Sequence, residues 1–229
     1  MVSRSAISAN GATSVVVFCP MRIERRHVER ALLGAGMGRV RVVQTGIGKE
    51  RVVRAMEGIT GALFVLAGAC GGLRKCADVP GIARVVDEKG NVWTPWGADA
   101  RGVTLAAVDR IVSTPEQKRA LGLGTGAAIV DMESHAFGAA CEARGVSWTV
   151  VRGVSDTPDQ TLPGELMAWI TPGGETRMGR AAWDMVRRPR LVGHVVGVLR
   201  RSNRVLPRVG VRVVEVVRAW EASGTGGNA

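Results

Sequence analysis

Short apolar runs alternate with amphipathic segments along the chain. The runs are rich in valine and isoleucine, which is typical of buried strands, and they lie at 14–19, 39–44, 61–66, 82–86, 92–94, 103–107, 127–131 and 147–152. Apolar residues at helical spacing predict helices at about 22–33, 49–57, 115–121 and 133–144. Strands that alternate with helices predict an α/β fold, in which helices flank a mixed sheet.

Prolines interrupt the helical pattern of the C-terminal part of the chain. Two helices are predicted, at about 175–186 and 191–205, with Pro189 and Pro207 at their ends. The valine-rich segment 209–220 is compatible with either a helix or a strand.

One sizeable domain accounts for most of the 229 residues. We assign residues 14–186 to this domain and residues 187–220 to a basic helical extension, packed on or beside it. Residues 1–13 are expected to form a flexible leader and residues 221–229 a disordered tail, because both are rich in small residues.

The formal net charge of +11 is concentrated near the C-terminus. Residues 175–220 hold eleven arginines and three acidic residues, a net charge of 11 − 3 = +8. A solvated basic face and a contact with an anionic membrane both explain this excess. Nucleic acid is a weaker explanation, because the chain has no Tyr and no zinc or RNP-type motif, so no nucleic-acid binding is predicted. An amphipathic surface suited to lipid headgroups is predicted from Leu191, Val195, Val198 and Leu199, opposite Arg200, Arg201 and Arg204.

The four cysteines form no CxxC pair, which indicates reduced core residues in a cytoplasmic protein. His27 and His194 have no cysteine or carboxylate partners at ligand spacing, so no metal site is predicted. The longest nearly apolar stretch, 62–73, is shorter than the ~20 residues that a membrane span requires. We therefore expect a cytoplasmic protein that at most contacts the inner membrane face.

Glycine-rich or acidic segments directly follow several predicted strands. Segment 45–49 turns into a helix, a geometry that can bind an anion, although a plain strand-to-helix connection has the same pattern. Asp131 and Glu133 end one strand, and Asp156 follows another. Paired carboxylates suit glycosidic cleavage: one supports a cationic sugar, and the other, protonated through burial, delivers a proton to the leaving group. Helix capping is the alternative role for these carboxylates.

Four motifs follow one another along the chain: TGIGK at 45–49, AGACGGL at 67–73, VDMES at 130–134 and VRGVSD at 151–156. In this order and with these separations they resemble the nucleoside phosphorylase and methylthioadenosine/adenosylhomocysteine nucleosidase superfamily, over about residues 15–159. The resemblance implies a three-layer α/β fold with a partly barrel-like sheet, and a homo-oligomer, dimeric or larger. The MESH string, the later Leu-Pro and the Arg-Arg-Pro look most like the hopanoid-associated phosphorylase branch, in which adenosylhopane loses adenine.

The resemblance implies a role for each residue at the substrate. Glu133 would bind the ribose hydroxyls, and Met132 would pack on the sugar. Asp156 would protonate, or hydrogen-bond to, N7 of the departing purine. The base pocket would be lined by Ala69, Cys70, Gly71 and Ser155.

The nucleophile is expected between the first predicted helix and the glycine turn. Glu24 matches the acidic residue with which nucleosidases activate water. The phosphate or water site would comprise Gly46, Gly48, Lys49 and Arg22. His135 is a further candidate, which could touch the sugar or serve as a core or capping residue.

The predicted function is cleavage of the N-glycosidic bond of an adenine-type nucleoside, without a cofactor. Phosphorolysis of adenosylhopane, with inorganic phosphate as co-substrate, is the favoured hypothesis, because the branch resemblance and the nearby cations agree. Hydrolysis by a soluble methylthioadenosine or adenosylhomocysteine nucleosidase is the alternative. The alternative from another functional class is a catalytically silent nucleoside-binding protein, because the family's base-stacking aromatic has no counterpart near 111–115.

Overall fold

A computed structural model of the protein describes residues 15–162 and 190–224 and, between them, residues 168–169, 171, 173–175, 177, 183 and 187. The predicted leader, the last five residues of the predicted tail and most of the predicted helix at 175–186 lie outside the described residues. The apolar side chains of Leu191, Val195, Val198 and Leu199 lie outside them as well.

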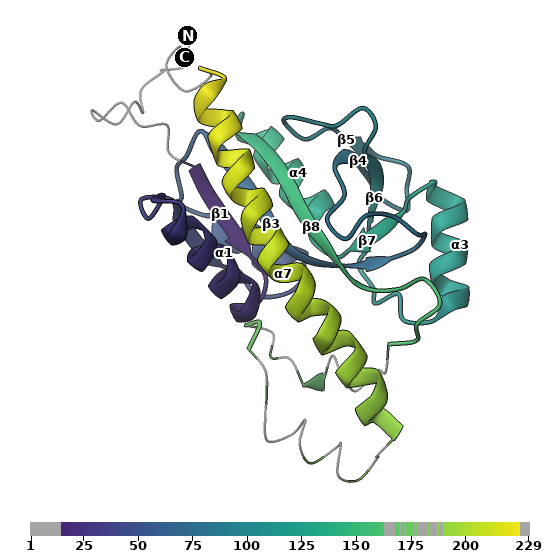
Figure 1. Ribbon diagram of the computed structural model, residues 1–229. Helices are drawn as coiled ribbons and strands as arrows, with labels where there is room; N and C mark the ends of the chain where they lie inside the picture. The colour runs from purple at the N-terminus through teal and green to yellow at the C-terminus, as the bar shows by residue number, and fades with distance from the viewer. Residues whose placement is uncertain are drawn as a thin grey trace.

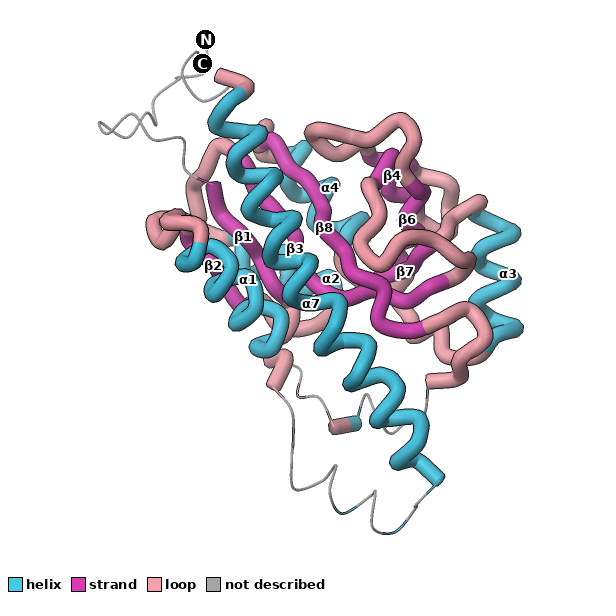
Figure 2. The backbone as a smooth tube through the Cα atoms, viewed as in Figure 1, coloured by secondary structure: helices cyan, strands magenta, loops and turns pink. Residues whose placement is uncertain are grey.

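Eight strands form one mixed sheet, as predicted (Figure 2). They are β1 (Val15–Cys19), β2 (Arg41–Gln44), β3 (Leu63–Gly72), β4 (Ile82–Val86), β5 (Val92–Trp93), β6 (Val103–Ala107), β7 (Ile129–Asp131) and β8 (Ser147–Asp156). Their order is β2-β1-β3-β7-β6-β4-β5, and β8 pairs with β3 off this path. β3 runs parallel to β1 and β8, whereas its end pairs antiparallel with β7.

The predicted end of the third strand at residue 66 is wrong, because the glycine-rich residues that follow continue β3 to Gly72. Gly71 and Gly72 pair with β7 on one side, while Gly71 also pairs with Asp156 of β8. A Cβ atom on Gly72 would lie 2.7 Å from the Asp156 backbone oxygen. The small residues therefore allow three strands to approach closely and bring their ends together.

Helices cover both faces of the sheet (Figure 1). They are α1 (Arg22–Gly34), α2 (Lys49–Met56), α3 (Pro115–Thr125), α4 (Ser134–Ala143) and α7 (Arg190–Ala222). α1 and α7 pack together on one face, and α2 and α4 on the other. Alternate residues of β1 face the two layers, so that Val15 and Val17 pack under α1 and α7 and Phe18 packs on the opposite side. Three of the four free cysteines are buried core residues, namely Cys19, Cys70 and Cys141.

The C-terminal segment 190–222 is one helix, so the predicted end at Pro207 is wrong. Pro207 is exposed, while Leu206 and Val209 on either side of it are buried, and Val209 packs against the sheet and α1. Burial of the residues before and after Pro207 offsets the hydrogen bond that proline cannot donate. The segment 209–220, which was compatible with a helix or a strand, is part of this helix. Among the described residues, no helix is both long and apolar enough to cross a membrane.

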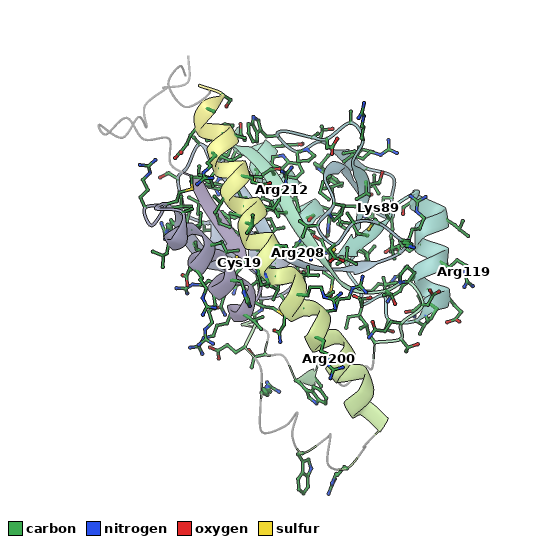
Figure 3. The ribbon with its side chains drawn as sticks, in the orientation of Figure 1. Cys19, Lys89, Arg119, Arg200, Arg208 and Arg212 are labelled. Carbon is green, nitrogen blue, oxygen red and sulfur yellow. The ribbon has the colours of Figure 1, made fainter. Side chains whose placement is uncertain are left out.

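Two arginines of α7 are held by partners on the domain. Arg201 donates to the Val154 backbone oxygen at 3.3 Å, and Arg201 and Arg208 both pair with Asp78. Arg200, Arg208 and Arg212 follow one another along the helix (Figure 3). Part of the positive charge therefore fastens α7 to β8 and the segment before β4.

Gly153 allows α7 to lie directly on β8. A Cβ atom there would lie 2.1 Å from Cγ1 of Val205 and 2.7 Å from Cγ2 of Val209. We expect Gly153→Ala to lower the free energy of unfolding by about 1–3 kcal/mol, because the methyl group overpacks the helix–sheet contact. Denaturant unfolding measures this change. The control is Gly124→Ala, because nothing lies within 4 Å of the added Cβ there. A Gly153→Ala protein that is as stable as this control would contradict the close packing of α7 on β8.

Candidate functional site

A cavity of about 190 Å³ lies where the ends of β3, β7 and β8 meet the start of α1. Its polar wall is formed by Glu24, Arg110, Asp131, Glu133, Arg152, Ser155 and Asp156. Its remaining wall is formed by Pro20, Met21, Ile47, Ala69, Cys70, Gly71, Ile111, Val112, Val130, Met132 and Leu162. Strand ends of an open α/β sheet commonly hold the ligand, and here they bring together carboxylates that are far apart in the sequence.

Glu24 stands on the first turn of α1 and is only 2% exposed. Its two carboxyl oxygens accept hydrogen bonds from the backbone N–H groups of Met21 and Ala69, both at 2.7 Å. Burial raises the pKa of Glu24 to about 7, against the lowering effect of these bonds and of Arg152. A Cβ on Gly68 would lie 2.6 Å from this carboxylate, so glycine is required there. Glu24 can therefore gain or lose a proton near neutral pH.

The raised pKa of Glu24 makes the stability of the protein depend on pH. Between its ordinary value of 4.5 and about 7, the folded protein holds a proton that the unfolded chain has released. The contribution of Glu24 to stability is therefore complete below pH 4.5 and declines by about 3 kcal/mol as the pH rises through 7. We expect Glu24→Gln to flatten this part of the stability curve, which thermal unfolding from pH 4 to 8 would measure. Equal slopes for the two proteins would contradict the assignment.

Arg152 lies in the apolar run of β8 and is completely buried. Its Nε and Nη2 lie 2.7 and 2.6 Å from Oδ2 of Asp131, and Nη2 donates to Oε2 of Glu133 at 3.2 Å. The two carboxylates raise the pKa of Arg152 and hold it as a cation, despite its burial. A lone arginine inside a buried strand was the sequence signal that could have revealed this network.

Glu133 is the residue before α4 and is 5% exposed. Its second oxygen accepts a hydrogen bond from the Gly48 backbone N–H at 3.0 Å, which ties the glycine turn to the cavity. Burial raises the pKa of Glu133, and Arg152 opposes this. Gly48 has a φ of 98°, so glycine suits the turn that aims this N–H inward.

Asp156 ends β8 and is 2% exposed. Its Oδ2 pairs with the ammonium group of Lys118, and its Oδ1 lies 3.3 Å from the Ser155 hydroxyl, which donates to the Cys70 backbone oxygen at 3.0 Å. Burial raises the pKa of Asp156, while Lys118 lowers it. Lys118, from α3, was missed from the sequence, although it shares a helix face with Leu121 and Gly122.

The predicted base-pocket residues lie side by side at the end of β3. Ala69, Cys70 and Gly71 all line the cavity, as does Ser155 opposite them. Burial raises the pKa of the Cys70 thiol well above its ordinary value, which makes it a packing group rather than a nucleophile. A Cβ on Gly71 would lie 3.0 Å from Cγ1 of Val130 and 3.5 and 3.6 Å from Oδ1 and Oδ2 of Asp156, so glycine avoids crowding at this carboxyl group.

Some predicted residues lie away from the cavity. Lys49 is bound to Asp109, and Arg22 is exposed, with its guanidinium 3.9 Å from Glu175. Neither lines the cavity, since each faces a surface carboxylate, and their place at a phosphate or water site stays a prediction. Gly46 does not line the cavity either, although Ile47 beside it does.

His135 lies next to the cavity wall rather than in it. Its Nε2 is 3.3 Å from Asp109, the residue that also binds Lys49. Its ring centroid lies 6.4 Å from that of Trp93. The contacts of His135 therefore connect α4 to the segment after β6 at the edge of the site.

Aliphatic side chains lie near residues 111–115, where the family resemblance implies a base-stacking aromatic. Ile111 and Val112 line the cavity there, together with Met132 from the segment after β7. Ile111 is 40% exposed, which places an apolar group at the mouth of the cavity. A flat ring inside would thus contact aliphatic groups on this wall.

The arrangement combines acid–base groups of different character in one cavity. Glu24 titrates near pH 7, Asp156 is buried against a cation, and Glu133 and Asp131 place negative charge around Arg152. Such a site can protonate one group of a ligand while it removes a proton from another. The negative charge between them can stabilise a cation that forms during the reaction.

Comparisons with known proteins agree with this architecture. A sequence model of the Phosphorylase superfamily matches residues 88–187, which include β6, β7, α4 and β8. No curated protein matches the chain. The sequence match and the fold together support the superfamily predicted from the four motifs.

Similar solved structures have low sequence identity, and their likeness shows the fold. The 5′-methylthioadenosine/S-adenosyl homocysteine nucleosidase of Helicobacter pylori is 14% identical over 92% of this chain and 99% of that chain, with a TM-score of 0.63. A putative nucleosidase of the same kind from Francisella philomiragia is 13% identical, covers 90% and 99% and has a TM-score of 0.60. Futalosine hydrolase of Helicobacter pylori is 13% identical, covers 90% and 97% and has a TM-score of 0.60.

Proposed function

We propose that the protein cleaves the N-glycosidic bond of an adenine-type nucleoside, with water as the nucleophile. The observation that carries the proposal is the presence of Glu24, Glu133 and Asp156 on one cavity wall, each buried and each in a different electrostatic setting. Structures that share the fold include that of a mutant Helicobacter pylori nucleosidase with 5′-methylthioadenosine in its active site.

Glu133 and Asp156 divide the work on the substrate. Glu133 accepts hydrogen bonds from the ribose hydroxyls, and Met132 packs on the sugar. As the bond from C1′ to the purine breaks, its electron pair goes to the base, and Asp156 supplies the proton that N7 takes up. The carboxylates around Arg152 stabilise the positive charge that develops on the sugar.

Glu24 acts on water at the other side of the sugar. Its carboxylate removes a proton from water as the oxygen bonds to C1′, and a pKa of about 7 gives it a large ionised fraction at neutral pH. Hydrolysis replaces the phosphorolysis favoured from the sequence, because Lys49 and Arg22 are turned to surface carboxylates. The cations that line the cavity, Arg110 and Arg152, pair with Glu88 and with two carboxylates, respectively.

A product assay tests the proposal. The protein is incubated with methylthioadenosine, adenosylhomocysteine or adenosine, with and without inorganic phosphate, and the products are separated by chromatography. We expect free adenine and a free sugar at the same rate in both buffers. A dependence on phosphate, with a sugar phosphate as product, would favour phosphorolysis, whereas binding without any base release would favour the silent nucleoside-binding alternative.

An adenosylhopane substrate is the finer hypothesis, which rests on the resemblance to the hopanoid-associated branch. An apolar 5′ substituent is supported by the aliphatic wall of Ile111, Val112 and Leu162 and by the exposure of Ile111 at the mouth. Adenine release from adenosylhopane in detergent should then exceed release from methylthioadenosine. Comparable release from plain adenosine would indicate that the wall does not select the substituent.

Contact with the inner face of the membrane would bring the protein to such a substrate. Arg200 and Arg204 are exposed on the basic helix, which supports an interaction with anionic headgroups. Flotation with anionic and neutral vesicles tests this, with a double Arg200→Ala, Arg204→Ala variant as the comparison. Failure to float, or equal flotation of the variant, would contradict membrane contact.

A homo-oligomer in the cytoplasm is a further proposal. Light scattering, which measures the mass of the particle in solution, is the test.

A further inference from the structure

Lys118 is a lysine with no access to solvent. It stands on the inner face of α3, where its side chain is 0% exposed. Its ammonium group pairs with Oδ2 of Asp156 and donates to the backbone oxygens of Thr157 and Gln160, at 2.7 and 2.8 Å. All three ammonium protons are therefore used, and the group is fixed in one orientation.

The position of Lys118 determines which part of Asp156 can meet a ligand. Oδ2 is bound to the lysine, whereas Oδ1 lies 3.3 Å from the hydroxyl group of Ser155, a residue that lines the cavity. The start of α3 is capped by Thr114, whose hydroxyl oxygen accepts a hydrogen bond from the Gln117 backbone N–H. A firmly anchored helix thus holds the cation against one oxygen of the carboxyl group.

We propose that Lys118 is a positioning residue for base release, which turns Oδ1 of Asp156 to the purine and stabilises the carboxylate that forms when Asp156 gives up its proton. The inference rests on the proposed function. In the reaction, the proton passes from Asp156 to N7, the C1′–N bond breaks with its electrons going to the base, and Glu24 takes a proton from the incoming water. The ammonium group of Lys118 keeps its proton throughout.

The charge of Lys118 also sets the pH range in which Asp156 is protonated. Three charged or titratable groups act on this carboxyl group: Lys118 of α3, Arg201 of α7 and Cys70 of β3. Lys118 is the group in direct contact, so its loss should affect Asp156 more than a change at Arg201. Without the ammonium group, Asp156 should hold its proton to a higher pH, because a buried carboxylate would then lack its nearest counter-charge.

The test uses Lys118→Met in the full chain, with Lys118→Arg as the conservative variant and Arg119→Met as the matched control on the exposed face of α3. We expect Lys118→Met to lower kcat for adenine release about 10–100-fold and to move the alkaline limb of kcat/KM up by about one to three pH units. Lys118→Arg should return the alkaline limb of kcat/KM towards its position in the parent protein. Arg119→Met should have the kcat and the pH profile of the parent.

A second substrate separates positioning from a general structural role. A nitrophenyl riboside has a leaving group that departs without a proton, so its cleavage should be nearly unchanged in Lys118→Met. Equal losses on both substrates, or an alkaline limb that does not move, would overturn the inference. If Lys118→Met fails to fold, Lys118→Gln takes its place, because it keeps hydrogen-bond donors and removes the charge. The same two measurements apply to it: cleavage of the two substrates and the position of the alkaline limb. A parent protein that releases no adenine would instead defeat the proposed function.

Discussion

Replacing Asp156 with asparagine is expected to slow adenine release about 10²–10⁴-fold, because the variant has no proton to give to the departing base. The amide keeps nearly the same shape and can still accept a hydrogen bond from Lys118. Substrate binding should therefore change little, and the loss should appear in kcat. Steady-state kinetics with methylthioadenosine measures this.

The control for this variant is Asp159→Asn, three residues further along the chain, in the loop that follows β8. Asp159 is exposed and does not line the cavity, so its variant should match the parent. Thermal unfolding of both variants shows whether Lys118, left without a charged partner, still permits folding. A folded Asp156→Asn protein that is as active as the parent would rule out the assigned acid.

Replacing Glu24 with glutamine is the second change with a large expected effect, again about 10²–10⁴-fold in kcat. The amide cannot take a proton from water. The parent's kcat/KM should rise as the pH passes through about 7, where Glu24 becomes ionised, and this acidic limb should be absent from the variant. A pH profile of both proteins from 5 to 9 measures it.

Glu29→Gln on the same helix is the matched control. Glu29 pairs with Arg25 at 2.7 Å, away from the cavity, so its loss should leave the pH profile unchanged. A Glu24→Gln profile with the parent's acidic limb would assign that limb to another group. Equal losses in the two variants would indicate damage to α1 rather than loss of a base.

The pattern of apolar residues predicted most elements, since strand and helix periods are local properties of the sequence. Residues 67–72 were harder, because glycine-rich sequence is typical of turns and only pairing with β7 and β8 makes it a strand. The continuity of α7 across Pro207 likewise depends on the burial of Leu206 and Val209, on either side of the proline. Such tertiary contacts override local signals.

The cavity shows the same division between local and long-range information. Glu133 and Asp156 follow from motifs, and Glu24 follows from the family resemblance. The partners that set their charge come from distant segments: Lys118 lies 38 positions from Asp156. Lysine on a short helix usually faces solvent, and nothing local shows its burial. The ion pair of Lys49 with Asp109 could not be predicted locally either, because Asp109 belongs to none of the four motifs.

Analysis of the sugar product in heavy-oxygen water tests the central claim most directly. The protein is given methylthioadenosine in labelled water that contains inorganic phosphate, and the sugar is examined by mass spectrometry. The account predicts free adenine and a free sugar that carries one labelled oxygen at C1′. Recovery of an unlabelled sugar phosphate, or of intact nucleoside, would contradict it.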